Sequence, residues 1–157
     1  MANEDGTVLM EGVRLIFRNF EGKEGKYNAA GDRNFGVVID DATAEAMLAD
    51  GWNVKYLKPR EEDDDDTPPT PWLPVAVGYG KGRPPRIVLV TERGRTNLDE
   101  SSVGMLDWAD ITNVDMIVRP YHYEVRGDTG IKAYAQSIYV TIEEDELEKK
   151  YGELDQQ

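Results

Sequence analysis

The strongest constraint on the fold is a pair of long β-prone segments near the C-terminal end. Residues 113–126 and 131–142 are rich in β-branched and aromatic side chains, and the connector at 127–130 reads Gly-Asp-Thr-Gly. Two such segments on either side of a short glycine-containing turn predict a β-hairpin. The other strands of the chain must then be arranged around this hairpin.

The length of the connector predicts which residues of the hairpin face each other. If all four residues form the loop, the facing pairs are Val125 with Lys132, Tyr123 with Tyr134, Tyr121 with Gln136, Arg119 with Ile138 and Ile117 with Val140. That face is apolar at one end and aromatic and basic at the other. The opposite face would carry packing residues: Val114, Met116, Val118, Pro120 and His122 against Ala133, Ala135, Ser137, Tyr139 and Thr141.

The size and composition fit one soluble domain. A chain of 157 residues can bury a continuous core, and without cysteine it has no disulfide, thiolate metal site or cysteine nucleophile. Its polar start and the absence of a run of about 20 apolar residues predict no membrane segment. We therefore expect a cytoplasmic protein with a disordered start at residues 1–6.

The net charge of −13 is concentrated in two segments. Residues 61–66 carry six negative charges and residues 143–157 carry a net −5, so the other 136 residues are left with −2. Between Lys81 and Arg95 there are five basic residues and one acid. The overall charge therefore does not exclude nucleic acid as a partner of the central part.

The rest of the chain predicts further strands and two short helices. Strands are expected at residues 7–20, with a bend at Gly12, and at 33–40, 52–57, 75–79 and 86–90; helices are expected at 42–49 and within 99–109. The fold class is therefore mainly β. A partly open antiparallel β-barrel over residues 7–142, followed by an acidic tail at 143–157, accommodates this order best.

Basic and aromatic residues recur along these strands and loops. Binding of a single strand needs cations that track phosphates and ring faces that stack bases. The alternative is that the rings fill the core or pair across strands. The nucleic-acid-binding candidates are Phe20, Lys26, Tyr27, Arg33, Phe35, Tyr79, Lys81, Arg83, Arg86, Arg93, Arg119, Tyr121, Tyr123, Lys132 and Tyr134.

Motifs for catalysis or metal binding are weak. His122 is the only histidine, and the acidic run 61–66 lacks the ligand spacing of a calcium loop. A two-metal nuclease centre could in principle use aspartates such as Asp40, Asp41, Asp107, Asp110 and Asp115. Helix caps and a helix surface explain the first three of them better. We expect no catalytic residue, no metal ligand and no cofactor.

Four segments together resemble the single-stranded DNA-binding proteins of bacteriophages, which are built on an oligonucleotide-binding (OB) barrel. The resemblance lies in Phe17-Arg-Asn-Phe20 and in the segments 33–40, 108–123 and 130–139 ahead of an acidic terminus. It implies an OB fold, sequence-tolerant binding of single-stranded DNA during phage replication, recombination or repair, and no cofactor. It also implies contacts of the acidic tail with replication or recombination proteins.

Two other functional classes stay open from the sequence. A metal-dependent nuclease would need a convergent carboxylate cluster, and a β-barrel protein-interaction module would show no salt-sensitive affinity for DNA. The tail could also serve only as a solubilising end, and the chain could form a homo-oligomer.

Overall fold

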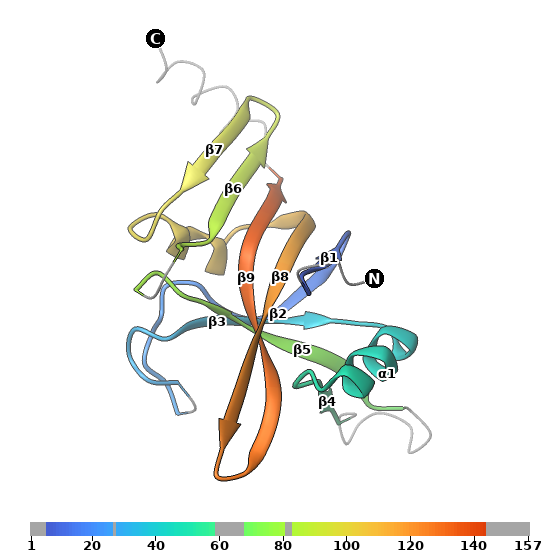
Figure 1. Ribbon diagram of the computed structural model, residues 1–157. Coiled ribbons are helices and arrows are strands. Elements are labelled where there is room, and N and C mark those ends of the chain that lie inside the picture. Colours follow the sequence, from blue (N-terminus) through green and yellow to red (C-terminus); the bar gives the residue numbers. More distant parts are fainter. Residues whose placement is uncertain (1–5, 27, 59–67, 81–82, 144–157) are drawn as a thin grey trace.

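The computed structural model describes residues 6–26, 28–58, 68–80 and 83–143, and it is mainly β (Figure 1). No helix within these ranges has the length and apolarity needed to cross a membrane. The elements are β1 (Val8–Met10), β2 (Arg14–Asn19), β3 (Arg33–Val38), α1 (Asp41–Asp50), β4 (Lys55–Leu57), β5 (Thr70–Val77), β6 (Arg86–Thr91), β7 (Gly94–Leu98), η1 (Val103–Asp107), β8 (Ile111–Val125) and β9 (Asp128–Ile142).

One curved sheet contains all the strands, and the β8–β9 hairpin is its longest part. The main strand order is β1-β8-β9-β5-β3-β2, with β4 beside β5 and the β6–β7 hairpin beside β9. Most ladders are antiparallel, as expected, but β9 pairs in parallel with both β5 and β6. The sheet is therefore mixed: β8 lies antiparallel along one edge of β9, and β5 and β6 lie parallel along the other.

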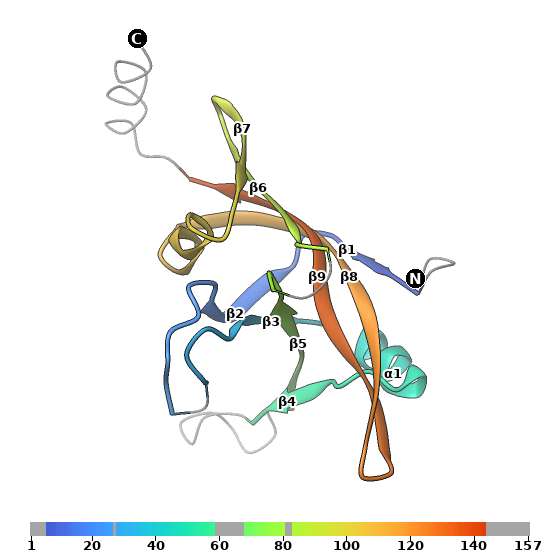
Figure 2. The ribbon, with the colours of Figure 1, turned by 60° about the vertical axis from the view of Figure 1, so that its left-hand side comes forward.

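The sheet curls around a core without closing. In the described part of the chain no ladder joins β1 to β2. A backbone hydrogen bond from Val13 N to Val114 O, at 3.0 Å, joins the residue before β2 to β8. Gly12 lies between β1 and β2 with φ of 60°, a conformation that glycine adopts at little cost. The predicted bend of the first strand at Gly12 is confirmed, and Figure 2 shows the curvature that results.

The two short helices follow their predicted signals. Asp40 accepts a hydrogen bond from Thr43 N at 2.6 Å and caps α1, while Gly51 ends the helix with φ of 101°. The hydrogen bonds from the Thr43 backbone and side chain lower the pKa of the Asp40 carboxyl. The second helix is the short 3-10 turn η1, which covers one end of the barrel with buried Val103 and Leu106.

The hairpin forms where predicted, but its register differs. The turn contains only Arg126 and Gly127, so Tyr121 faces Lys132, Arg119 faces Tyr134 and Tyr123 faces Gly130. The predicted pairing was wrong by four positions along β9, because Asp128, Thr129 and Gly130 pair as strand instead of forming the loop. Between the turn and Ala135 the shift is even, so these side chains keep their predicted faces and the basic and aromatic residues near the turn still share one side.

The core lies on the inner side of the curved sheet. It is built from alternate residues of the long strands, among them Val37, Leu73, Val75, Val118 and Ile138, each with 1% or less of its surface exposed. This single cluster runs from β1 to β9 and includes residues of α1 and η1. The opposite side of the sheet is called the outer face.

Candidate nucleic-acid interface

The outer face near the hairpin turn brings together four of the predicted residues. The rings of Tyr121 and Tyr134 meet edge to face, with centroids 5.8 Å apart. The Arg119 guanidinium lies 5.7 Å and the Lys132 ammonium 5.2 Å from the centroid of Tyr134. Tyr121 is 55% exposed. Two rings and two cations on one solvent-facing surface can contact both bases and phosphates.

A second group of rings extends this surface across β5 and β2. Phe17 packs edge to face on Trp72 with centroids 5.2 Å apart, and the Lys55 ammonium lies 5.8 Å from the Trp72 ring. Phe17 is 59% exposed. Trp72 and Ala76, the neighbour of Tyr134, share the outer side of β5, about 13 Å apart along the strand. We call Phe17, Lys55, Trp72, Arg119, Tyr121, Lys132 and Tyr134 the aromatic face.

A β-bulge turns Phe17 toward this surface. The pairing of β2 with β3 shifts between Ile16 and Asn19, and Phe17 has φ of 51°, in the left-handed region. Strict alternation would place Phe17 with Leu15 on the core side. The bulge instead puts Ile16 and Phe17 on the same side, and such a strained backbone is typical of functional positions.

Gly36 provides the space beneath Trp72. A Cβ atom built on Gly36 would lie 2.6 Å from Trp72 Cε3 and 2.9 Å from Ile16 Cγ1. The indole therefore lies directly against the backbone of β3. Gly36 therefore has a packing role on this surface.

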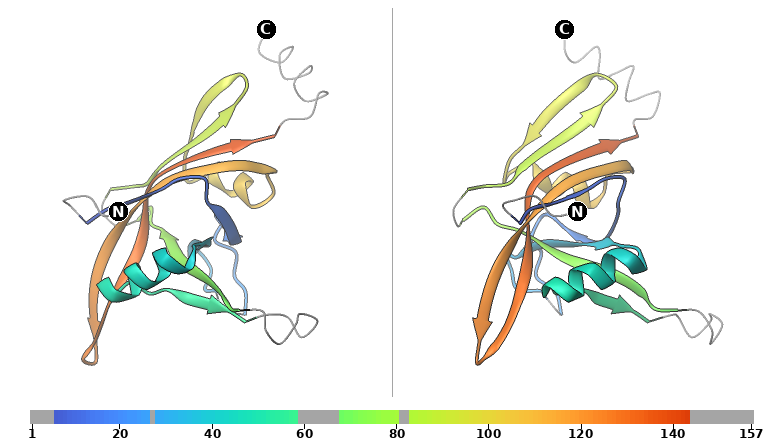
Figure 3. Two further views of the ribbon diagram at one scale, coloured as in Figure 1. Left: turned by 90° about the vertical axis from the view of Figure 1, so that its right-hand side faces the viewer. Right: turned by 45° about the vertical axis from the view of Figure 1, so that its right-hand side comes forward.

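Tyr123 has a structural contact on the hairpin. Its hydroxyl donates a hydrogen bond to Asn53 Oδ1 at 3.0 Å, and its ring lies against Gly130, where any side chain would collide with it. The Asn53 backbone N–H also bonds to Ile131 O at 3.0 Å. These contacts attach the hairpin to the segment after α1, which lies alongside it (Figure 3).

Two of the predicted rings lie in the core. Phe20 is fully buried and Phe35 is 2% exposed, and they stack on each other with centroids 4.9 Å apart. Neither ring has a free face on which a base could stack, so we leave both out of the interface. A phenylalanine in a strand suits core packing and base stacking equally well, so the burial of these two rings could not be predicted from the sequence.

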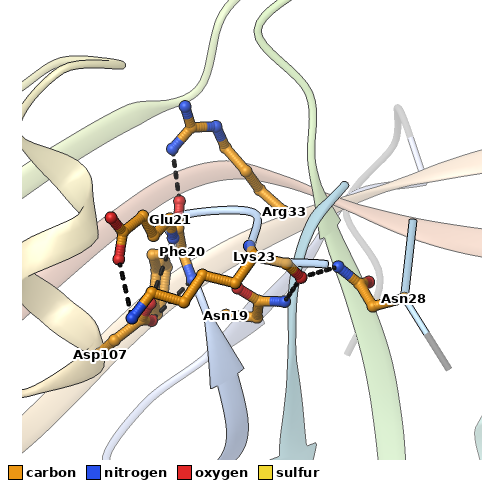
Figure 4. A network of polar contacts seen from close by, with 7 residues as sticks. All are labelled: Asn19, Phe20, Glu21, Lys23, Asn28, Arg33 and Asp107. Atoms are coloured by element: carbon orange, nitrogen blue, oxygen red, sulfur yellow. Dashed lines mark hydrogen bonds and ion pairs between the residues drawn. The ribbon is translucent and has the colours of Figure 1, made fainter. Parts of the chain in front are cut away.

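Arg33 and Tyr79 lie at the end of the barrel that η1 covers. Arg33 donates a hydrogen bond from Nη1 to Phe20 O at 2.5 Å (Figure 4). Its guanidinium lies 5.4 Å from the ring of Tyr79. Only 16% of the Arg33 side chain is exposed. Burial raises the pKa of Tyr79, whose hydroxyl has no hydrogen-bond partner among the described residues. Arg33 and Tyr79 therefore stabilise the fold and do not form part of the outer face.

The same barrel end carries an exposed tryptophan with acidic neighbours. Trp108 is 74% exposed, and the Lys23 ammonium lies 4.9 Å from its ring. The Asp107 carboxylate accepts hydrogen bonds from the backbone N–H groups of Phe20 and Glu21 at 2.7 and 3.2 Å. Carboxylates repel phosphate, so this end of the barrel is less suited to DNA than the aromatic face.

The remaining predicted cations lie in loops or on the β6–β7 hairpin. Lys26, Arg83 and Arg93 are exposed, and Arg86 begins β6. Tyr27 and Lys81 lie outside the described residues, as do the acidic run 61–66 and the tail from residue 144.

The outer face also carries five residues with a ring or a cation that were not among the predicted binding residues: Phe17, Lys55, Trp72, Arg95 and Tyr139. Phe17 and Tyr139 follow β-bulges, which change the side of the sheet that each residue faces. Trp72 lies in the segment 68–74, which contains four prolines, and a strand was not expected before Val75. The alternation of Trp72 with buried Leu73 was the signal that could have identified it.

Acidic residues in the described ranges form no group of three or more potential metal ligands. Asp40 caps α1, Asp107 binds two backbone N–H groups, and Asp115 accepts a hydrogen bond from Gly12 N at 2.9 Å. These carboxylates have separate structural partners on separate elements. The arrangement gives no support to a two-metal nuclease centre at these positions.

The geometry agrees with the relationships of the chain to known proteins. Residues 3–157 match a protein-family model described as "Putative phage ssDNA-binding domain". The chain belongs to this family. Comparison with curated protein sequences gave no match.

Solved structures of a phage protein have the same fold as this member of the phage ssDNA-binding family. The single-stranded DNA-binding protein from bacteriophage Enc34, in complex with ssDNA, aligns with a TM-score of 0.55 and 12% identity over 90% of this chain and 89% of that one. A C-terminal truncation of the Enc34 protein gives 0.55 and 13% over 90% and 88%. At such identities the match shows the fold, and the OB-like architecture expected from the sequence is confirmed.

Proposed function

We propose that this protein binds single-stranded DNA on its aromatic face, with little sequence preference and without a catalytic step. The observation that carries the proposal is an exposed group in which Arg119, Tyr121 and Lys132 each lie within 6 Å of the centroid of the Tyr134 ring. Membership in the phage ssDNA-binding family supports single-stranded DNA as the ligand. The related Enc34 protein was solved in complex with ssDNA.

The chemistry of the face explains the expected preference for single strands. Every base has a π-face, so stacking on Tyr121, Tyr134 or Trp72 requires no particular base and contributes about 1–3 kcal/mol per ring. A duplex keeps its bases stacked on each other and presents only phosphates. Protection of single strands during phage DNA replication, recombination or repair follows from this selectivity.

A titration with a fluorescent oligothymidylate and a matched duplex, each at two salt concentrations, tests the proposal. We expect tighter binding of the single strand and weaker binding at higher salt, because phosphate contacts release counterions. Equal affinity for the duplex, or no measurable binding of the single strand at low salt, would contradict the proposal.

Two tyrosine variants locate the binding face. Tyr121→Ala should weaken binding, whereas Tyr56→Ala should leave it unchanged. Tyr56 is a matched control because it is 48% exposed on β4 but alternates with Lys55, so it faces the other side of the sheet. Equal effects of the two substitutions would move the interface away from the aromatic face.

We also propose contacts with partners other than DNA. The net −5 at residues 143–157 could contact replication or recombination proteins, or could compete with DNA for basic side chains. Sedimentation of the protein with and without DNA would establish whether it acts as a homo-oligomer.

A further inference from the structure

The β6–β7 hairpin enlarges the outer face beyond the aromatic face. β6 pairs in parallel with the last part of β9, from Arg86 beside Ser137 to Val90 beside Thr141. In Figure 1 this hairpin projects at the end of the molecule opposite the β8–β9 turn. The outer side of β9 therefore continues from Tyr134 onto a second hairpin.

A β-bulge in β9 places Tyr139 on this side. Val118 pairs with Ala135 and Ile117 with Ser137, so Gln136 is the extra residue between the two pairs. Beyond it, Ile138 and Val140 are buried, and Tyr139 faces Asp115 on the side of β8 that carries Arg119. The alternation of the sequence predicted Tyr139 on the packing face, and that prediction was wrong because the bulge reverses the alternation.

Two arginines flank the Tyr139 ring. The guanidinium carbons of Arg86 and Arg95, one on each strand of the β6–β7 hairpin, both lie 5.8 Å from the ring centroid. Both arginines are exposed, while Val88, the ladder partner of Tyr139, is 1% exposed. Contact with the ring restricts the two guanidinium groups to one place and leaves their N–H groups near solvent.

The acid that faces Tyr139 on β8 is already engaged in hydrogen bonds. Asp115 faces Tyr139 across the ladder, and its carboxylate oxygens accept hydrogen bonds from Gly12 N at 2.9 Å and Asn113 Nδ2 at 3.1 Å. The ring of Tyr139 also lies between β8 and the β6–β7 hairpin. Neither guanidinium forms an ion pair with an acid of the described residues, so within this part of the chain both are available to an external anion.

We propose that Arg86 and Arg95, positioned by Tyr139, form a phosphate-binding subsite for single-stranded DNA that has crossed the aromatic face. The proposal rests on the proposed function and extends the same binding path along β9. Tyr134 and Tyr139 are five residues apart, about 16 Å along a strand. A planar guanidinium matches the geometry of a phosphate group and can bind two of its oxygens.

Oligonucleotides of two lengths test this subsite. We compare oligothymidylates of about 4 and about 16 nucleotides, the range covered by one OB domain, with the wild type and with the double variant Arg86→Gln/Arg95→Gln. The short strand should bind both proteins equally within about twofold. The long strand should lose about tenfold in affinity for the double variant, and its salt slope should fall by about 1.4, because each single-strand phosphate contact contributes about 0.7.

Two further variants separate the subsite from a general effect of charge. Lys58→Gln removes one exposed cation outside the hairpin and should change the affinity for both lengths by the same small factor. Tyr139→Phe keeps the ring and should bind long strands normally, whereas Tyr139→Leu should weaken binding of long strands alone. Thermal melting of each variant establishes that the hairpin remains folded.

Three results would overturn the subsite. They are an equal loss for both lengths in the double variant, no loss for either length at low salt, or normal binding of long strands by Tyr139→Leu. Failure of the proposed function itself would look different, because the wild type would then bind neither length.

Discussion

Phe17 and Phe20 lie three residues apart, and the structure assigns them opposite roles. Phe17 is 59% exposed against Trp72, whereas Phe20 is fully buried against Phe35. We expect Phe20→Ala to lower the free energy of unfolding by about 3–5 kcal/mol, which lowers the melting temperature by about 6–20 °C for a domain of this size. Phe17→Ala should lower the free energy of unfolding by only about 1 kcal/mol, the energy of one exposed aromatic contact.

The effects on binding should be reversed. Loss of one stacking ring at Phe17 should cost about 1–3 kcal/mol, or about 5–150-fold in the dissociation constant, while folded Phe20→Ala should bind nearly normally. Alanine keeps the Cβ atom, so the left-handed backbone at Phe17 stays equally strained in the variant. Thermal melting and a fluorescence titration with oligothymidylate measure both quantities. Unchanged affinity of Phe17→Ala, or a loss of stability equal to that of Phe20→Ala, would refute this assignment.

Three further outcomes follow from the structure. Gly36→Ala should displace the Trp72 indole, with a loss of about 1–3 kcal/mol in stability and weaker DNA binding; normal melting and binding would contradict the packing described. Tyr123→Phe should lower stability by about 0.5–1.5 kcal/mol through loss of the hydrogen bond to Asn53 without changing affinity, as chemical denaturation and titration can verify. Shortening the chain to residues 1–142 removes a net −5 and should tighten DNA binding most at low salt; if the affinity at low salt is unchanged, the tail does not compete with DNA.

Much of the fold was predictable because its signals are local. Asp40 and Gly51 mark the ends of α1 through capping and a left-handed backbone, and these are properties of the residues themselves. The hairpin was predictable from β-branched and aromatic composition. The outer grouping of Arg119, Tyr121, Lys132 and Tyr134 survived a wrong register because the shift was even and the alternation of a strand has a period of two.

Only the tertiary structure decided which rings face solvent. Phe17 and Tyr139 became outward residues through β-bulges, and a bulge depends on the pairing with a neighbouring strand, which the local sequence does not specify. Phe20 and Phe35 became core residues because η1 and the inner sheet enclose them, although their composition suits stacking on a base equally well. The sequence by itself determined a mainly β chain with aromatic and basic strands. The division of those aromatics between core and interface depended on contacts between segments far apart in the chain.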